Sequence, residues 1–194
     1  MAKPETLKRV LKEQNIDENV VNKINVGFEN VTDKSAKKKK AEYLFHAVNE
    51  MERSLDKDTC QRILESCACV TKGSGLEKTI KRFTEKTKSL SLKEKIEELC
   101  KIKHMGNPVL LKDGTILVSP GSISENSIYS CPCPQISGVD IEKPKSHTYC
   151  LCCVGQFKFQ YENALEKKID VKIKSSPFKS NGKKPCAFIL SIID

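Results

Sequence analysis

Apolar residues recur at helical spacing through the first half of the chain. Within residues 34–55, one stripe at i, i+4, i+7 and i+11 is formed by Leu44, Val48, Met51 and Leu55. This period predicts an amphipathic helix with that stripe turned to a core. The same kind of pattern, helped by Asp17 as a helix cap and by the capping boxes Ser74–Glu77 and Ser91–Glu94, predicts further helices over 5–14, 17–25 and 58–68 and after residues 74 and 91.

The pattern changes after residues 105–108, which read Met-Gly-Asn-Pro. Two β-rich runs flank Asp113-Gly114, which indicates a hairpin over 109–118. A Pro-, Gly- and Ser-rich stretch predicts a loop over 119–147. The periodic segments after it predict a helix over 154–167 and strands over 169–174 and 186–193.

The order of these elements predicts an α+β protein. A helical region over residues 1–104 is expected to pack on a cysteine-rich α+β domain over 105–194. That domain would hold an antiparallel sheet with one or two helices. Long loops in compact domains are usually functional or partly structured, so the stretch 119–147 is a candidate for function.

Charge and composition narrow the function classes. The net charge is +9, but all basic residues except Arg9, Arg53, Arg62 and Arg82 are lysines, aromatic residues are scarce and tryptophan is absent. Base stacking and bidentate base contacts need aromatic residues and arginine, so a nucleic-acid partner is not expected. The chain also lacks a phosphate-binding glycine loop of the P-loop or dinucleotide type.

The chain is expected to be cytoplasmic. It has no run of 18 apolar residues, which excludes a predicted membrane span. Its N-terminus lacks the apolar segment of a secretory signal. Its ten cysteines are therefore expected to be thiols rather than disulfides.

The cysteines gather in short clusters, which scattered core cysteines do not explain. The clusters are Cys67-Ala68-Cys69, Cys131-Pro132-Cys133 and Cys150-Leu151-Cys152-Cys153, with Cys186 before the last predicted strand. Thiolates are soft ligands, and a tetrahedral zinc site needs four donors, so two clusters would have to converge. Packing at a helix end is the alternative for Cys67 and Cys69. Cys60 and Cys100 lie on apolar helix faces and are predicted to be core residues.

Of the three histidines, His147 is the candidate for chemistry. It lies three residues before Cys150, where an imidazole can serve as a metal ligand or as a base for a neighbouring thiolate. His46 and His104 are expected to be structural, since His104 closes a predicted helix, where a cation suits the helix dipole.

The last 45 residues carry a family pattern. A Cys153-x-Gly155 step opens a helix that contains Glu162, a Val-Lys-Ile strand follows at 171–173, and Gly182 precedes Cys186-Ala187-Phe188. Over residues 147–194 this pattern resembles the small-molecule-binding domain named after 4-vinyl reductase. The resemblance implies an antiparallel sheet with helices on one side and a ligand pocket. In some members it also implies a structural zinc, for which Cys153, Glu162 and Cys186 are the matching residues.

The chain departs from this pattern at one metal ligand. Where zinc-binding members place another cysteine before the glycine, this sequence reads Ser-Pro-Phe at 176–178. Cys150 and Cys152, or Cys131 and Cys133, are the candidates to replace that ligand.

The same ending supports an enzymatic alternative. The Gly-x-x-x-Cys-x-Phe pattern at 182–188 is also similar to the ending of amino-thiazoline-carboxylate hydrolases. In that interpretation the chain is a cysteine-dependent hydrolase or reductase, with Cys153 as nucleophile and His147 as base. A helix that starts just after Cys153 would favour its thiolate, but it would favour metal binding equally.

The sequence therefore favours a small-molecule- or metal-binding, sensor-like protein over an enzyme. Zinc is the expected metal, and an iron–sulfur cluster is a less favoured one. The expected partner is a small molecule, a homodimer is the other partner considered, and no membrane partner is expected. In a third interpretation no cysteine is special and the helices form a dimer face. The predicted metal ligands are Cys67, Cys69, Cys131, Cys133, Cys150, Cys152, Cys153, Glu162 and Cys186.

Overall fold

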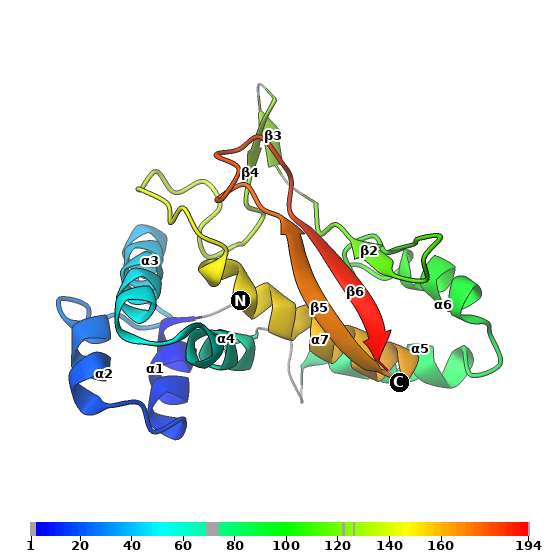
Figure 1. Cartoon of the computed structure of the whole chain (residues 1–194), viewed down its shortest axis with the longest axis horizontal. Coiled ribbons are helices and arrows are strands. Elements are labelled where there is room, and N and C mark those ends of the chain that lie inside the picture. Colours follow the sequence, from blue (N-terminus) through cyan, green and yellow to red (C-terminus); the bar gives the residue numbers. More distant parts are fainter. Residues whose placement is uncertain (1–2, 69–73, 122, 126, 194) are drawn as a thin grey trace. The chain divides into compact units, whose positions relative to one another are not determined.

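The computed structural model describes residues 3–68, 74–121, 123–125 and 127–193 (Figure 1). By its contacts the chain divides into two compact units, and neither is continuous in sequence. Unit 1 comprises Met1–Cys69 and Cys133–Gly155, and unit 2 comprises Val70–Pro132 and Gln156–Asp194.

Unit 1 is helical. Its helices, blue to cyan in Figure 1, are α1 (Pro4–Glu13), α2 (Glu18–Asn25), α3 (Lys37–Ser54) and α4 (Lys57–Ser66). The unit also contains η1 (Thr148–Cys150) and the start of α7 (Leu151–Leu165). The predicted stripe of α3 is buried, with Leu44, Val48 and Met51 almost fully enclosed. Leu7 and Leu11 of α1 and Ile63 of α4 are also completely buried. Apolar periodicity thus explains the core of this unit.

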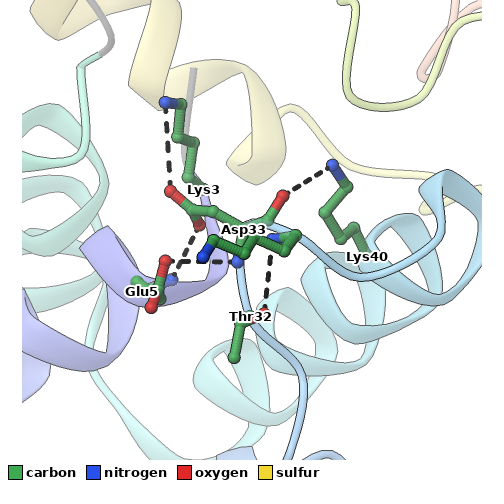
Figure 2. A network of polar contacts seen from close by, with 6 residues as sticks. Lys3, Glu5, Thr32, Asp33 and Lys40 are labelled. Atoms are coloured by element: carbon green, nitrogen blue, oxygen red, sulfur yellow. Dashed lines mark hydrogen bonds and ion pairs between the residues drawn. The ribbon is translucent and has the colours of Figure 1, made fainter.

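Polar contacts from a loop complete the start of α1. Lys3, at the N-cap of this helix, makes no side-chain cap hydrogen bond. Instead the amide of Glu5 donates to the carboxylate of Asp33 at 3.2 Å, and the amide of Asp33 donates back to the Glu5 carboxylate at 3.3 Å (Figure 2). Lys40 of α3 donates to the carbonyl of Asp33 at 3.0 Å. A residue 28 positions away therefore satisfies an open helix N–H group.

Unit 2 combines helices with sheets. Its helices are α5 (Gly75–Lys86), α6 (Leu92–Leu99) and the rest of α7. Its strands are β1 (Val109–Leu110), β2 (Ile116–Val118), β3 (Ile123–Glu125), β4 (Ile128–Ser130), β5 (Lys168–Ser175) and β6 (Ala187–Ile193). Over the described residues, β1-β2-β6-β5 form one antiparallel sheet and β3 pairs with β4.

Helix α7 packs on this larger sheet. The rings of Phe157 and of Phe188 in β6 lie 5.0 Å apart between centroids. The hydroxyl of the completely buried Tyr161 donates to the carbonyl of Met105 at 2.8 Å. Gly106 has φ +79°, and a Cβ there would lie 2.5 Å from Val118 Cγ1, so glycine is required for this close packing.

The predicted α+β class is confirmed. The sequence predicts a domain boundary between residues 104 and 105, where the secondary structure changes. The two units are defined by contacts instead. The predicted boundary therefore stays a prediction. No described helix is both long and apolar enough to cross a membrane.

Four local expectations were wrong. His104 does not close a helix, because α6 ends at Leu99 and His104 has φ +74°. The stretch 119–147 is not all loop, because it contains the β3–β4 hairpin, which the amide of Tyr129 ties to the carbonyl of Gly182 at 2.8 Å. Helix α7 begins at Leu151 rather than at residue 154, because η1 leads directly into it. Cys100 is exposed, because α6 ends at Leu99 and leaves Cys100 as its C-cap.

Candidate functional site

The end of α4 and the first turn of α7 meet in unit 1 at a glycine. A Cβ built on Gly155 would lie 2.2 Å from the carbonyl oxygen of Glu65 and 2.6 Å from its Cα. No side chain fits at position 155 with the backbone where it is. This contact positions Cys67, the C-cap of α4, and Cys152, the second residue of α7.

Cys67 and Cys152 are neighbours in this contact, and both side chains are completely buried. Burial, with a smaller contribution from the Cys152 thiol, raises the pKa of the Cys67 thiol to about 12. The Cys152 thiol donates to the carbonyl of Tyr149 at 3.2 Å. Two predicted candidates from distant clusters are thus brought together, in a place where the neutral thiol is favoured.

Cys133 joins the same region through Tyr149. Its sulfur lies 3.3 Å from the Tyr149 hydroxyl, and the Tyr149 ring packs edge-on against Phe45 of α3 at 5.3 Å between centroids. Cys133 and Cys150 are buried, whereas Cys153 is half-buried in the first turn of α7. Unit 1 therefore holds four of the predicted ligands, Cys67, Cys133, Cys150 and Cys152, in its core.

A pocket of about 420 Å³ opens in unit 1 where α3 ends and α4 begins. We call it the α3–α4 pocket. It is lined by Glu52, Leu55, Lys57, Cys60, Gln61, His147, Thr148 and Leu151, all from unit 1.

The polar groups of this pocket come from separate segments. The Thr148 hydroxyl donates a hydrogen bond to the carboxylate of Glu52, which ties η1 to α3. The amide of Gln61 donates to the carboxylate of Glu65 at 2.6 Å. His147, the predicted ligand or base, is half-buried at the N-cap of η1 and lines the pocket.

Cys60 lies on the pocket wall but is almost fully buried. Its thiol lies 3.5 Å from the carbonyl of Met51, to which it donates. Burial, then the carboxylates of Glu52 and Asp56, raise the pKa of this thiol. The expectation that Cys60 belongs to the core is confirmed, and its thiol is neutral at physiological pH.

Three predicted metal ligands belong to unit 2 instead. Cys131 is half-buried after β4, and Cys186 is buried directly before β6. Glu162 of α7 accepts a hydrogen bond from the amide of Ile169 at 3.2 Å, which links this helix to the start of β5. Cys69 lies outside the described residues.

Across the described ranges, no three His, Cys, Asp or Glu side chains are arranged to hold a metal ion. A tetrahedral zinc site needs four donors, and the pair Cys67 and Cys152 amounts to two. The residues that sequence analysis missed are the pocket residues Glu52, Lys57, Gln61 and Thr148. Surface positions on helices carry no periodic signal for a pocket, so only the meeting of distant segments could reveal them.

A family model described as a family of unknown function, DUF6144, matches residues 5–192 of the chain. Searches of the curated proteins and of the solved structures returned no match.

Proposed function

This chain belongs to the family of unknown function DUF6144, and we propose that it is a sensor-like protein that binds a small molecule in the α3–α4 pocket. The observation that carries the proposal is the pocket itself, which joins charged, polar and apolar groups from three segments of unit 1. Its volume of about 420 Å³ lies in the range of small-molecule sites.

The contents of the pocket favour binding over catalysis. A cysteine nucleophile needs its thiolate, and such thiols have lowered pKa values. The pKa of Cys60 is raised instead, and that of Cys67 is about 12. Cys153, the nucleophile of the enzymatic alternative, follows η1 and the start of α7 rather than preceding an open helix end. The helix-dipole argument for its thiolate is therefore weaker.

A second candidate is zinc binding through buried thiols. The meeting of Cys67 and Cys152 at the Gly155 contact favours it, because soft thiolates select zinc and iron–sulfur centres. A bound cation would also reverse the preference for neutral thiols. The described donors do not complete a tetrahedral set, which ranks this candidate below the pocket.

For both candidate functions, small-molecule binding and zinc binding, we propose that the protein acts in the cytoplasm. A reducing compartment keeps thiols such as Cys60, Cys67 and Cys100 outside disulfides, as they are in this chain.

The pocket proposal is tested by ligand-observed NMR with a fragment library on the full chain. Gln61→Trp is designed to fill the pocket from an exposed position, and Asp58→Trp is the matched control on the same helix outside the lining. We expect fragments that bind the unmodified chain and the control but not Gln61→Trp. Absence of any binding fragment, or fragments that still bind Gln61→Trp, would overturn the proposal.

The zinc candidate is tested by elemental analysis of protein purified without chelator. About one equivalent of zinc, lost in Cys67→Ser and kept in Cys100→Ser, would support it. A metal-free chain would rule this candidate out and leave the pocket proposal unaffected.

A further inference from the structure

Two opposite charges line the α3–α4 pocket without pairing with each other. Glu52 comes from the last turn of α3, and Lys57 is the first residue of α4. Among the ion pairs of the described residues, neither Glu52 nor Lys57 takes part in one. Their charged atoms are therefore too far apart for a direct ion pair, although both belong to one cavity.

The carboxylate of Glu52 is held in place rather than loose. It accepts the hydrogen bond of Thr148, a residue 96 positions along the chain. Burial raises the pKa of the Cys60 thiol on the pocket wall, and the fields of Glu52 and Asp56 raise it further. This part of the pocket is therefore negative and suits a cationic group.

Lys57 supplies the opposite charge at the start of α4. The helix end itself is already capped, since Asp56 accepts from the amide and the hydroxyl of Thr59 at 2.8 and 2.7 Å. A ligand anion would therefore be attracted by the Lys57 ammonium rather than by the helix end. A purely anionic ligand would meet the carboxylate of Glu52, and a purely cationic one would meet the ammonium of Lys57.

Apolar side chains complete the lining. Leu55, the C-cap of α3, and Leu151, the first residue of α7, are both half-buried at the pocket. Their side chains can make apolar contacts with the uncharged part of a ligand that lies between its two charged ends. The volume of about 420 Å³ exceeds that of a single ion and suits a molecule of amino-acid to dipeptide size.

On these grounds, and resting on the proposed function, we infer that the pocket ligand is a small zwitterion with an apolar body, whose ammonium faces Glu52 and whose carboxylate faces Lys57. The class includes apolar amino acids and short peptides with free ends. Charges of both signs in one pocket give specificity, because a ligand that lacks one charge leaves a protein charge without a partner.

The test uses three dipeptide probes with the same two side chains and different end groups, measured by isothermal titration calorimetry on the full chain. L-leucyl-L-leucine carries both charges, its N-acetyl derivative lacks the ammonium, and its amide lacks the carboxylate. We expect the zwitterion to bind about fivefold more tightly than either derivative, a difference that fits partly exposed charge pairs.

Two variants assign the charges. Glu52→Gln should remove the preference for the dipeptide over its N-acetyl derivative, and Lys57→Gln should remove the preference over its amide. Lys38→Gln, an exposed lysine of α3 outside the pocket, should keep both preferences. Loss of neither preference in the variants would overturn the inference.

The probes also separate this inference from the proposed function. Equal binding of the three dipeptides, or no binding of any of them while library fragments still bind the pocket, would overturn the zwitterion inference alone. A fragment library without hits would overturn the proposed function together with the inference.

Discussion

Gly155 in the first turn of α7 lies directly against the backbone of Glu65 near the end of α4. A Cβ at position 155 would be 2.2 Å from the Glu65 carbonyl oxygen, a distance that real Cβ atoms do not adopt. Helix α4 and the start of α7 therefore approach as closely as their backbones allow. Cys67 and Cys152 owe their proximity to this contact.

Replacing Gly155 by alanine should destabilise unit 1. The added methyl group meets rigid backbone rather than a flexible side chain, so the helices must separate, at a cost of about 1–3 kcal/mol or more. Chemical denaturation of the purified variant measures this cost. Gly75→Ala is the matched control, because a Cβ at the start of α5 meets nothing within 4 Å. It should leave stability equal or raise it by up to about 1 kcal/mol. Equal effects of the two substitutions would contradict the close approach.

The sequence predicted the fold well where one pattern dominates. The stripe of Leu44, Val48 and Met51 in α3 and the turn around Asp113-Gly114 correspond to observed elements, because periodicity and turn chemistry are local. The capping box of Ser91 and Glu94 is present with both of its hydrogen bonds. The β3–β4 hairpin was missed because three-residue strands are too short to show alternation.

The site was predictable only in part, because its geometry depends on contacts between distant segments. The clustering of cysteines pointed to Cys67 and Cys152, but no local pattern says which clusters meet. The spacing of His147 from Cys150 makes it a candidate, and it lines a pocket. Its pocket neighbours Glu52 and Lys57 resemble ordinary surface charges in the sequence. Gly155 belongs to the Cys-x-Gly motif of the sequence, but only its contact with the Glu65 backbone shows its steric role.

Lys8 should matter more for stability than a surface lysine. Its half-buried ammonium donates to the carbonyls of Phe28, Glu29 and Val31 at 3.0, 2.8 and 2.9 Å, and it lies 5.2 Å from the centre of the Tyr43 ring. Lys8→Met would leave these carbonyls without that donor.

We expect Lys8→Met to lower the free energy of unfolding by about 1–3 kcal/mol and to speed hydrogen exchange in the loop at 28–31. The exposed Lys12 of the same helix provides the control, since Lys12→Met should change stability by less than about 0.5 kcal/mol. If both substitutions had the same small effect, Lys8 would not organise this loop.

Cys67 should make the protein less stable at alkaline pH. Its thiol has a pKa of about 12 in the folded chain, chiefly through burial, against about 8.5 in an unfolded chain. Between these values the folded state keeps the proton and the unfolded state releases it. Stability is therefore unaffected below about pH 8.5 and falls as pH rises, by about 1.4 kcal/mol per pH unit from this group alone.

Denaturation curves between pH 7 and 10.5 check this sign. Cys67→Ser should lose stability more gradually above pH 8.5 than the unmodified chain, because serine does not titrate there. Cys100→Ser, at an exposed C-cap, is the control and should follow the unmodified chain. Parallel curves for Cys67→Ser and the unmodified chain would mean that Cys67 does not keep its proton.

Gln160 should reduce the stability of unit 2. This residue of α7 is completely buried, and within the described residues neither its amide nitrogen nor its amide oxygen has a hydrogen-bond partner. A buried polar group without a partner costs about 1–3 kcal/mol. Methionine has a similar length and no amide, so Gln160→Met should raise the free energy of unfolding by about that amount.

Chemical denaturation measures the change. The control is Gln61→Met on the exposed face of α4, which should stay within about 0.5 kcal/mol of the unmodified chain. A less stable Gln160→Met would contradict the prediction, because it would mean that the amide does bind a polar partner in solution, such as an internal water molecule.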